Sequence, residues 1–76
     1  MNKIRRKELT RIINQLEELQ NQIETSVDEE QEAFDNLGES LQQTERGSKM
    51  EEAVENMQNA IESIGEAILY LEDASE

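Results

Sequence analysis

The side chains that most often perform catalysis are rare in this sequence. It contains no His and no Cys, so a general base would have to be a carboxylate, a Lys or the single Tyr, and no Ser–His or Cys–His pair can form. Its three glycines, Gly38, Gly47 and Gly65, are far apart, whereas a phosphate-binding loop needs several glycines together. The chain is therefore predicted to be non-enzymatic, with no catalytic residue, no metal site and no cofactor.

Carboxylates are the abundant reactive group, and one pattern among them is partly similar to a known magnesium site. Glu51, Glu52 and Glu55 lie on adjacent turns of a predicted helix, and Glu32 and Asp35 form a Glu-x-x-Asp pair. All-helical nucleotide pyrophosphohydrolases bind magnesium with Glu-Glu-x-x-Glu followed downstream by Glu-x-x-Asp. Here the order is reversed, which favours solvated acidic helix faces over a metal site.

An acidic run in the first half is the candidate surface for a partner. It consists of Asp28, Glu29, Glu30, Glu32 and Asp35. Three interpretations remain open: a solvated face near a helix start, a docking patch for a basic partner, and mimicry of DNA, in which carboxylates replace phosphates.

The basic residues are concentrated at the N-terminus. The first eleven residues hold five basic residues and one acidic residue, whereas the remainder holds two basic and eighteen acidic residues, and the net charge is −12. The five form the basic head: Lys3, Arg5, Arg6, Lys7 and Arg11. We expect them to pair with acids near the C-terminus, and because an acidic body repels nucleic acid and anionic membrane, neither is expected as a direct partner.

Arg46 and Lys49 are the two cations outside the basic head. They lie near the start of a predicted helix, where they either pair with local carboxylates or anchor an anionic ligand such as a nucleotide.

The second half has a clear heptad pattern. From Met50 onward a large residue, an Ala and a Val or Ile recur every seven positions, which is typical of a helix packed against another helix in coiled-coil geometry. We expect close backbone approach at the alanines. The residues predicted to form the core and oligomer seam are Met50, Ala53, Met57, Ala60, Ile61, Ile64, Ala67, Ile68 and Leu71.

The first half repeats the same three-four spacing with an interruption. A Ser-x-x-Glu box at Ser26 and a polar residue at Glu30 predict a kink or restart of the helix near Ser26. The predicted single domain, residues 1–76, has a helix over about 3–37, a connection over 38–44 and a helix over about 45–74. Thr44 or Ser48 is the expected N-cap of the second helix.

The fold class expected from these elements is all-α, a long antiparallel helical hairpin that self-associates into a bundle. The chain is short, with one Phe and one Tyr, and small scaffolds need disulfides, metal ions or oligomerisation. Without Cys or His, oligomerisation to a dimer or higher state remains, and Leu69 with Tyr70 is a candidate contact edge. No apolar run is long enough for a membrane span or signal-peptide core, so a cytoplasmic location is expected.

Three stretches of the sequence resemble a known group of proteins. They are residues 28–37 (DEEQEAFDNL), 45–47 (ERG) and 50–53 (MEEA) with the acidic heptads that follow. They are similar to small acidic helical proteins encoded by phages and prophages of low-GC Gram-positive bacteria, a family without an assigned activity. The resemblance implies a short accessory phage gene, and such genes often encode inhibitors of host defence or of host enzymes.

Three functions follow as hypotheses. The leading one is a homo-oligomeric inhibitor or modulator of a host protein, acting through the acidic helical surface and including DNA mimicry. An oligomeric sponge for a nucleotide-type immune signal is the second, although the net charge of −12 opposes it. A structural or assembly protein of the phage is the third.

Overall fold

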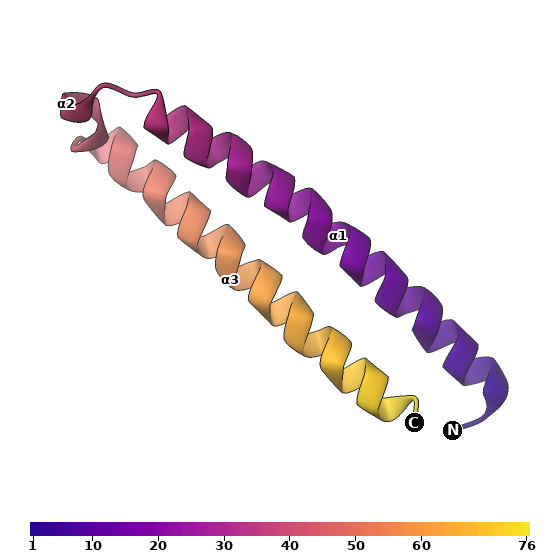
Figure 1. The fold of residues 1–76 in the computed structure, drawn as a ribbon. Coiled ribbons are helices and arrows are strands. Elements are labelled where there is room, and N and C mark those ends of the chain that lie inside the picture. Colours follow the sequence, from indigo (N-terminus) through magenta and orange to yellow (C-terminus); the bar gives the residue numbers. More distant parts are fainter.

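The computed structural model describes residues 1–76 and contains three helices (Figure 1). Two long helices, α1 (Lys3–Asp35) and α3 (Glu45–Ala74), lie side by side, and the short α2 (Glu39–Gln42) lies in the connection between them. Both termini lie at the same end of a rod with extents of 58 × 15 × 11 Å. The prediction of an all-helical chain is confirmed, since the structure has no strand.

A continuous apolar seam on α3 faces α1. Its residues alternate between steps of three and four positions, as expected for a helix that packs along one partner. They are Met50, Val54, Met57, Ile61, Ile64, Ile68 and Leu71, and each is buried or half-buried. Val54, at 8% exposure, is the most buried of the hydrophobic side chains.

Two of the three alanines predicted for this seam are not buried in it. Ala60 and Ala67 are exposed, and Ala53 is half-buried. Each alanine directly precedes a β-branched residue, and one position on a helix is a rotation of about 100°. The larger β-branched side chains fill the contact with α1, so the alanines are turned to its flank. The placement of Ala60 and Ala67 in the intrachain core was therefore wrong.

The seam on α1 continues through Ser26 without a break. Residues spaced alternately by three and four positions are again buried or half-buried: Leu9, Ile13, Leu16, Gln20, Ile23, Val27, Glu30 and Phe34, followed by Leu37 just beyond the end of α1. Ser26 lies inside one continuous helix, so the predicted restart there is not observed. The sequence pattern looked interrupted because Glu30, a charged residue, occupies a seam position.

Gln20, a polar residue in the seam of α1, forms a hydrogen bond to α3. Its side-chain amide Nε2 donates to the backbone carbonyl of Ile61 at 3.1 Å. A Cβ on Gly65 would lie 3.3 Å from the same nitrogen, so the missing side chain leaves room for this contact. A polar group that finds its partner in an otherwise apolar contact helps to specify the register of the two helices.

The turn is closed by the side chain of Gln42 and the backbone of Gly47. Gln42 Nε2 donates to the carbonyls of Phe34 and Leu37, at 3.1 and 3.3 Å, and so links α2 to the C-terminal end of α1 and the residues that follow it, where the Phe34 carbonyl also accepts from the Leu37 N–H. Gly47 is buried, and a Cβ there would overlap the carbonyl oxygen of Gln42. α3 begins after Thr44.

The core of this rod is thin. Among the hydrophobic residues only Ile13, Val27 and Val54 are buried, and no side chain is less than 2% exposed. Two helices enclose their seam from two sides and leave both of its edges open. One of these edges is acidic and the other is apolar.

Candidate functional site: an acidic groove between the helices

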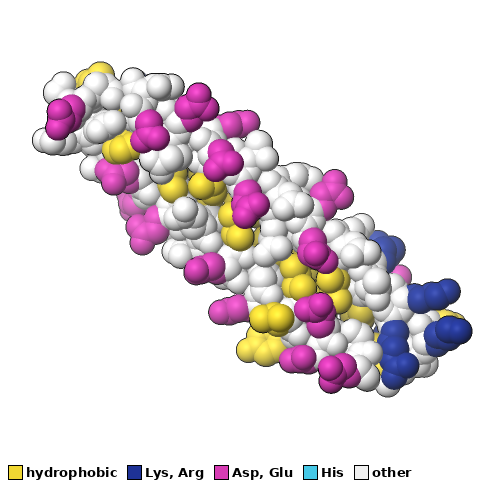
Figure 2. All heavy atoms as spheres, viewed as in Figure 1, with side chains coloured by type: hydrophobic (Ala, Val, Ile, Leu, Met, Phe, Trp, Pro, Cys, Tyr) yellow, Lys and Arg dark blue, Asp and Glu magenta, His cyan; other side chains and the backbone are white.

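An open groove of about 590 Å³ runs along one edge of the seam. Val27 and Ile61 supply its apolar part, and polar side chains from both helices line it. These are Glu24 and Asp28 of α1 and Gln58 and Glu62 of α3. Figure 2 shows the general pattern, with acidic side chains on both helices beside a band of hydrophobic ones. We call this feature the acidic groove.

The positions of these side chains follow from the seam. Glu24 directly follows the seam residue Ile23, and Gln58 directly follows Met57, so both are rotated by about 100° to the same edge. The same step places Glu17 and Glu51 on this edge. Since the groove contains residues of both helices, the edge belongs to the hairpin as a whole.

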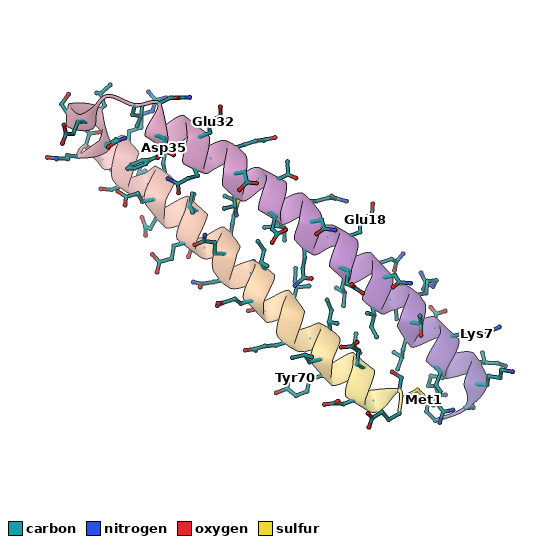
Figure 3. All side chains as sticks on the ribbon, viewed as in Figure 1. Met1, Lys7, Glu18, Glu32, Asp35 and Tyr70 are labelled. Carbon is teal, nitrogen blue, oxygen red and sulfur yellow. The ribbon has the colours of Figure 1, made fainter.

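The predicted acidic run is divided by the fold. Asp28 lines the acidic groove, while Glu29, Glu32 and Asp35 are exposed elsewhere on α1. Glu32 projects from the side of α1 that faces away from α3 (Figure 3). Glu30 is half-buried at a seam position and borders a separate surface depression, so it does not share a face with the other four acids of the run. Its neighbours in sequence point outward because a run of consecutive residues covers all sides of a helix.

Glu24, Gln58 and Glu62 were not among the residues singled out from the sequence. The search for a continuous acidic run could not find them, because they come from two helices that are far apart in the chain. The signal that identifies them is their place beside seam residues on both helices.

The basic head forms no ion pair with α3. The structure has two ion pairs, Glu8 with Arg11 and Glu45 with Lys49, each within a single helix. Figure 2 shows the basic side chains gathered at one end of the rod. The acids at the end of α3 make no ion pair with these side chains. The expected pairing with the C-terminal acids is therefore not found.

Arg11 has an electrostatic effect on its own helix. Its guanidinium donates a hydrogen bond to the Glu8 carboxylate, and this bond together with the opposite charge lowers the pKa of Glu8 and raises that of Arg11. A carboxylate with a depressed pKa stabilises the fold above its unfolded pKa, and that stabilisation is lost as pH falls through the folded value. Both side chains are more than half exposed, so water screens the pair and its contribution to the stability of the fold is small.

Arg46 and Lys49 share a surface depression with acids. Its other residues are Glu30, Glu45 and Met50. The ammonium of Lys49 lies 3.4 Å from the carboxylate of Glu45. Carboxylates next to both cations repel an anionic ligand, so this geometry does not favour a nucleotide site.

Leu69 and Tyr70 lie on the outer surface of α3. They are 63% and 74% exposed, and they border a depression with Glu66 and Asp73. Tyr70 projects away from α1 (Figure 3). The pair is small and flanked by charge.

The five acids whose pattern is partly similar to a magnesium site do not form a cluster in the structure. Glu51, Glu52 and Glu55 lie on α3, Glu32 and Asp35 lie on α1, and no group of three or more acids is placed so that it could hold a metal ion.

Comparisons with known proteins give no family. No protein-family model, no curated protein and no solved structure matches this chain. Neither of the long helices combines the length and apolar character needed to cross a lipid bilayer.

Proposed function

We propose that this chain is a non-enzymatic binding protein, an antiparallel helical hairpin that self-associates and engages a basic segment of a host protein. The observation that carries the proposal is the acidic groove, where Val27, at 9% exposure, and the half-buried Ile61 form the apolar part of the lining between Glu24, Asp28 and Glu62. Such a groove offers apolar contact to an amphipathic segment and carboxylates to its basic side chains.

The charge of the whole rod supports the same proposal. Two ion pairs neutralise few of its nineteen acids, so the surface field attracts basic partners and speeds their association. In a phage-encoded protein this activity is inhibition or modulation of a host factor. Where the host factor binds DNA, the carboxylates occupy the place of phosphates.

The experiment compares two variants with the same loss of charge. The groove variant carries Glu24→Gln, Asp28→Asn and Glu62→Gln, and the control carries Glu18→Gln, Glu66→Gln and Asp73→Asn, outside the groove. Tagged proteins are used to capture partners from a Gram-positive host lysate, and binding of each captured protein is then titrated with both variants.

The expected result is a captured protein that the control retains and the groove variant loses by roughly tenfold or more in affinity, since paired charges at an interface contribute strongly. Competition by duplex DNA for the captured protein identifies a DNA mimic. Equal binding by both variants would refute the role of the groove.

A further inference from the structure

The edge of the seam opposite the acidic groove carries almost no charge. It consists of the residue directly before every second seam position of each helix, and we call it the apolar flank. The residues before the remaining seam positions, which include Glu8, Glu29 and Lys49, lie farther from the seam on each helix. The members of the apolar flank are Ile12, Leu19, Ser26 and Ala33 of α1 and Ala53, Ala60, Ala67 and Ala74 of α3. They recur every seven residues on both helices, so the flank runs along the whole rod.

The flank is open to solvent. Leu19 is 47% exposed, Ala33, Ala60 and Ala67 are exposed, and Ile12 is half-buried. Alanine does not hold helices apart, so a neighbouring helix can approach closely here. Large apolar residues beside small ones supply the protrusions and recesses of a helix–helix contact.

We infer that the apolar flank is covered by a second copy of this chain, turned end over end, to give a four-helix dimer. The inference rests on the self-association proposed above and is independent of the host partner. A symmetric pair uses the same patch twice, and Leu19 and Ala60, near the middle of α1 and α3, lie next to the two-fold axis.

The face of the rod that carries the flank is large enough for a stable dimer. A face with the length and width of the rod, 58 by 15 Å, has an area on the order of 900 Å², and standard interfaces bury about 800 Å² per partner, so the flank would form the apolar centre of an interface that also includes the polar residues beside it. The second hairpin would close the open edge of a seam in which no side chain is yet fully buried.

The charge distribution selects the end-over-end arrangement. The half of the rod at the turn, residues 20–60, holds eleven acidic and two basic residues, whereas the half at the termini holds eight acidic and five basic. Two hairpins with their turns together would place the strongly acidic halves side by side. The end-over-end dimer instead places each acidic half beside the other copy's basic head.

The helix dipoles agree with this arrangement. Neither α1 nor α3 has a basic residue in its last turn, although cations there are stabilising. In the end-over-end dimer, Arg5 of one copy lies near the C-terminal end of α1 in the other, because the two positions are about equally distant from residue 19. Arg46 likewise lies near the C-terminal end of the other α3.

Three substitutions to Arg test the interface by light scattering over a series of protein concentrations. Ala60→Arg and Leu19→Arg place a charge in the flank and should weaken the dimer by at least roughly tenfold, because a charge buried without a partner is costly. Gln58→Arg, on the acidic groove side of the same turns of α3, should leave the mass at two chains. Circular dichroism confirms that each variant is helical.

Leu69→Arg distinguishes the rival contact edge. It leaves the dimer intact if the apolar flank is the interface, and it produces monomers if Leu69 and Tyr70 form the contact, which would overturn the inference. A native mass of one chain at all concentrations would overturn it as well as the proposed self-association. If the groove variant loses host-protein binding but remains a dimer, the binding role of the acidic groove and the dimer through the apolar flank are shown to be independent.

The orientation is tested by a spin label on Glu76→Cys, since the chain has no other Cys. The end-over-end dimer separates the two labels by more than about 40 Å, because residue 76 lies some sixteen helical positions from the centre on each side. A distance below about 20 Å would show that the termini lie together, and would overturn the orientation.

Discussion

Gly47 is the glycine whose missing side chain this fold requires. It is buried, and a Cβ would overlap the backbone carbonyl of Gln42, the residue that also binds the end of α1. Backbone cannot move aside as a flexible side chain can. The close approach of α2 to the first turn of α3 therefore depends on this one position.

Gly47→Ala should destabilise the protein although Ala is the better helix former. The helix gain is about 1 kcal/mol, and overpacking against backbone costs about 1–3 kcal/mol, so the net effect is a loss in free energy of unfolding. Urea denaturation followed by circular dichroism measures it. Gly38→Ala is the comparison without a clash, since nothing lies within 4 Å of a Cβ there, and it should have only the modest cost of Ala at the N-cap of α2. A Gly47→Ala protein as stable as the native one would show that the turn adapts.

Substitution of Gln20 is expected to stabilise the protein, in contrast to substitution of Gly47. Gln20 helps to fix the register of the two helices at a cost in stability. It is a half-buried polar residue in an apolar seam and makes one hydrogen bond to Ile61. The Ile61 carbonyl lies inside α3, where it also accepts from the backbone N–H four residues later, so loss of the Gln20 bond does not leave it unsatisfied, and a leucine adds apolar burial in the seam. Gln20→Leu should therefore raise the melting temperature, whereas Gln22→Leu, at an exposed position, should change it little. A lower melting temperature for Gln20→Leu would mean that the register bond outweighs the gain in apolar contact.

At the scale of the helices, stability depends on the residues that face the neighbouring helix. Ile61→Asp and Ile68→Asp place a carboxylate in the seam, where an unpaired charge costs several kcal/mol, and each should unfold a protein with so thin a core. Glu62→Lys, one position from Ile61 but exposed, should be nearly neutral. Thermal unfolding of the three variants checks this, and similar melting temperatures would contradict the assignment of the seam.

The two long helices could be predicted from the sequence. Which residues of each helix face the other helix could be predicted only in part. The heptad spacing of Val54, Ile61 and Ile68 indicated a helix and a buried stripe. The alanines beside them share the same period, so spacing alone could not decide which member of each pair turns toward α1. Packing decides it, because the larger side chain fills the seam and the smaller one is left on the flank.

The candidate site was harder to predict than the fold. The acidic run 28–35 was visible as a local cluster, but a helix turns such a run to all sides. The acidic groove depends on Glu24 and Glu62, which meet only through the register of α1 against α3. That register is set by long-range contacts such as the one from Gln20 to Ile61, which no local pattern contains.

At the scale of the whole molecule, the dominant electrostatic effect is self-repulsion. The net charge is −12 on a rod 15 by 11 Å in section, and both ion pairs lie within single helices. Like charges on α1 and α3 therefore face each other across the acidic groove, and a second copy brings still more acids together. Repulsion of this kind destabilises compact states.

Added salt should therefore stabilise this protein. Between about 0.01 M and about 1 M salt the Debye length falls from about 30 Å to about 3 Å, which screens repulsion across the groove and between copies while weakening only two exposed ion pairs. The melting temperature, measured at fixed protein concentration, should rise by several degrees, since about 1 kcal/mol corresponds to about 4–8 °C in a domain of this size. A variant with Glu29→Gln, Glu32→Gln and Asp35→Asn should be more stable at low salt and gain less from added salt. If salt instead lowered the melting temperature of the native protein, attraction between the basic head and the acidic body would outweigh repulsion.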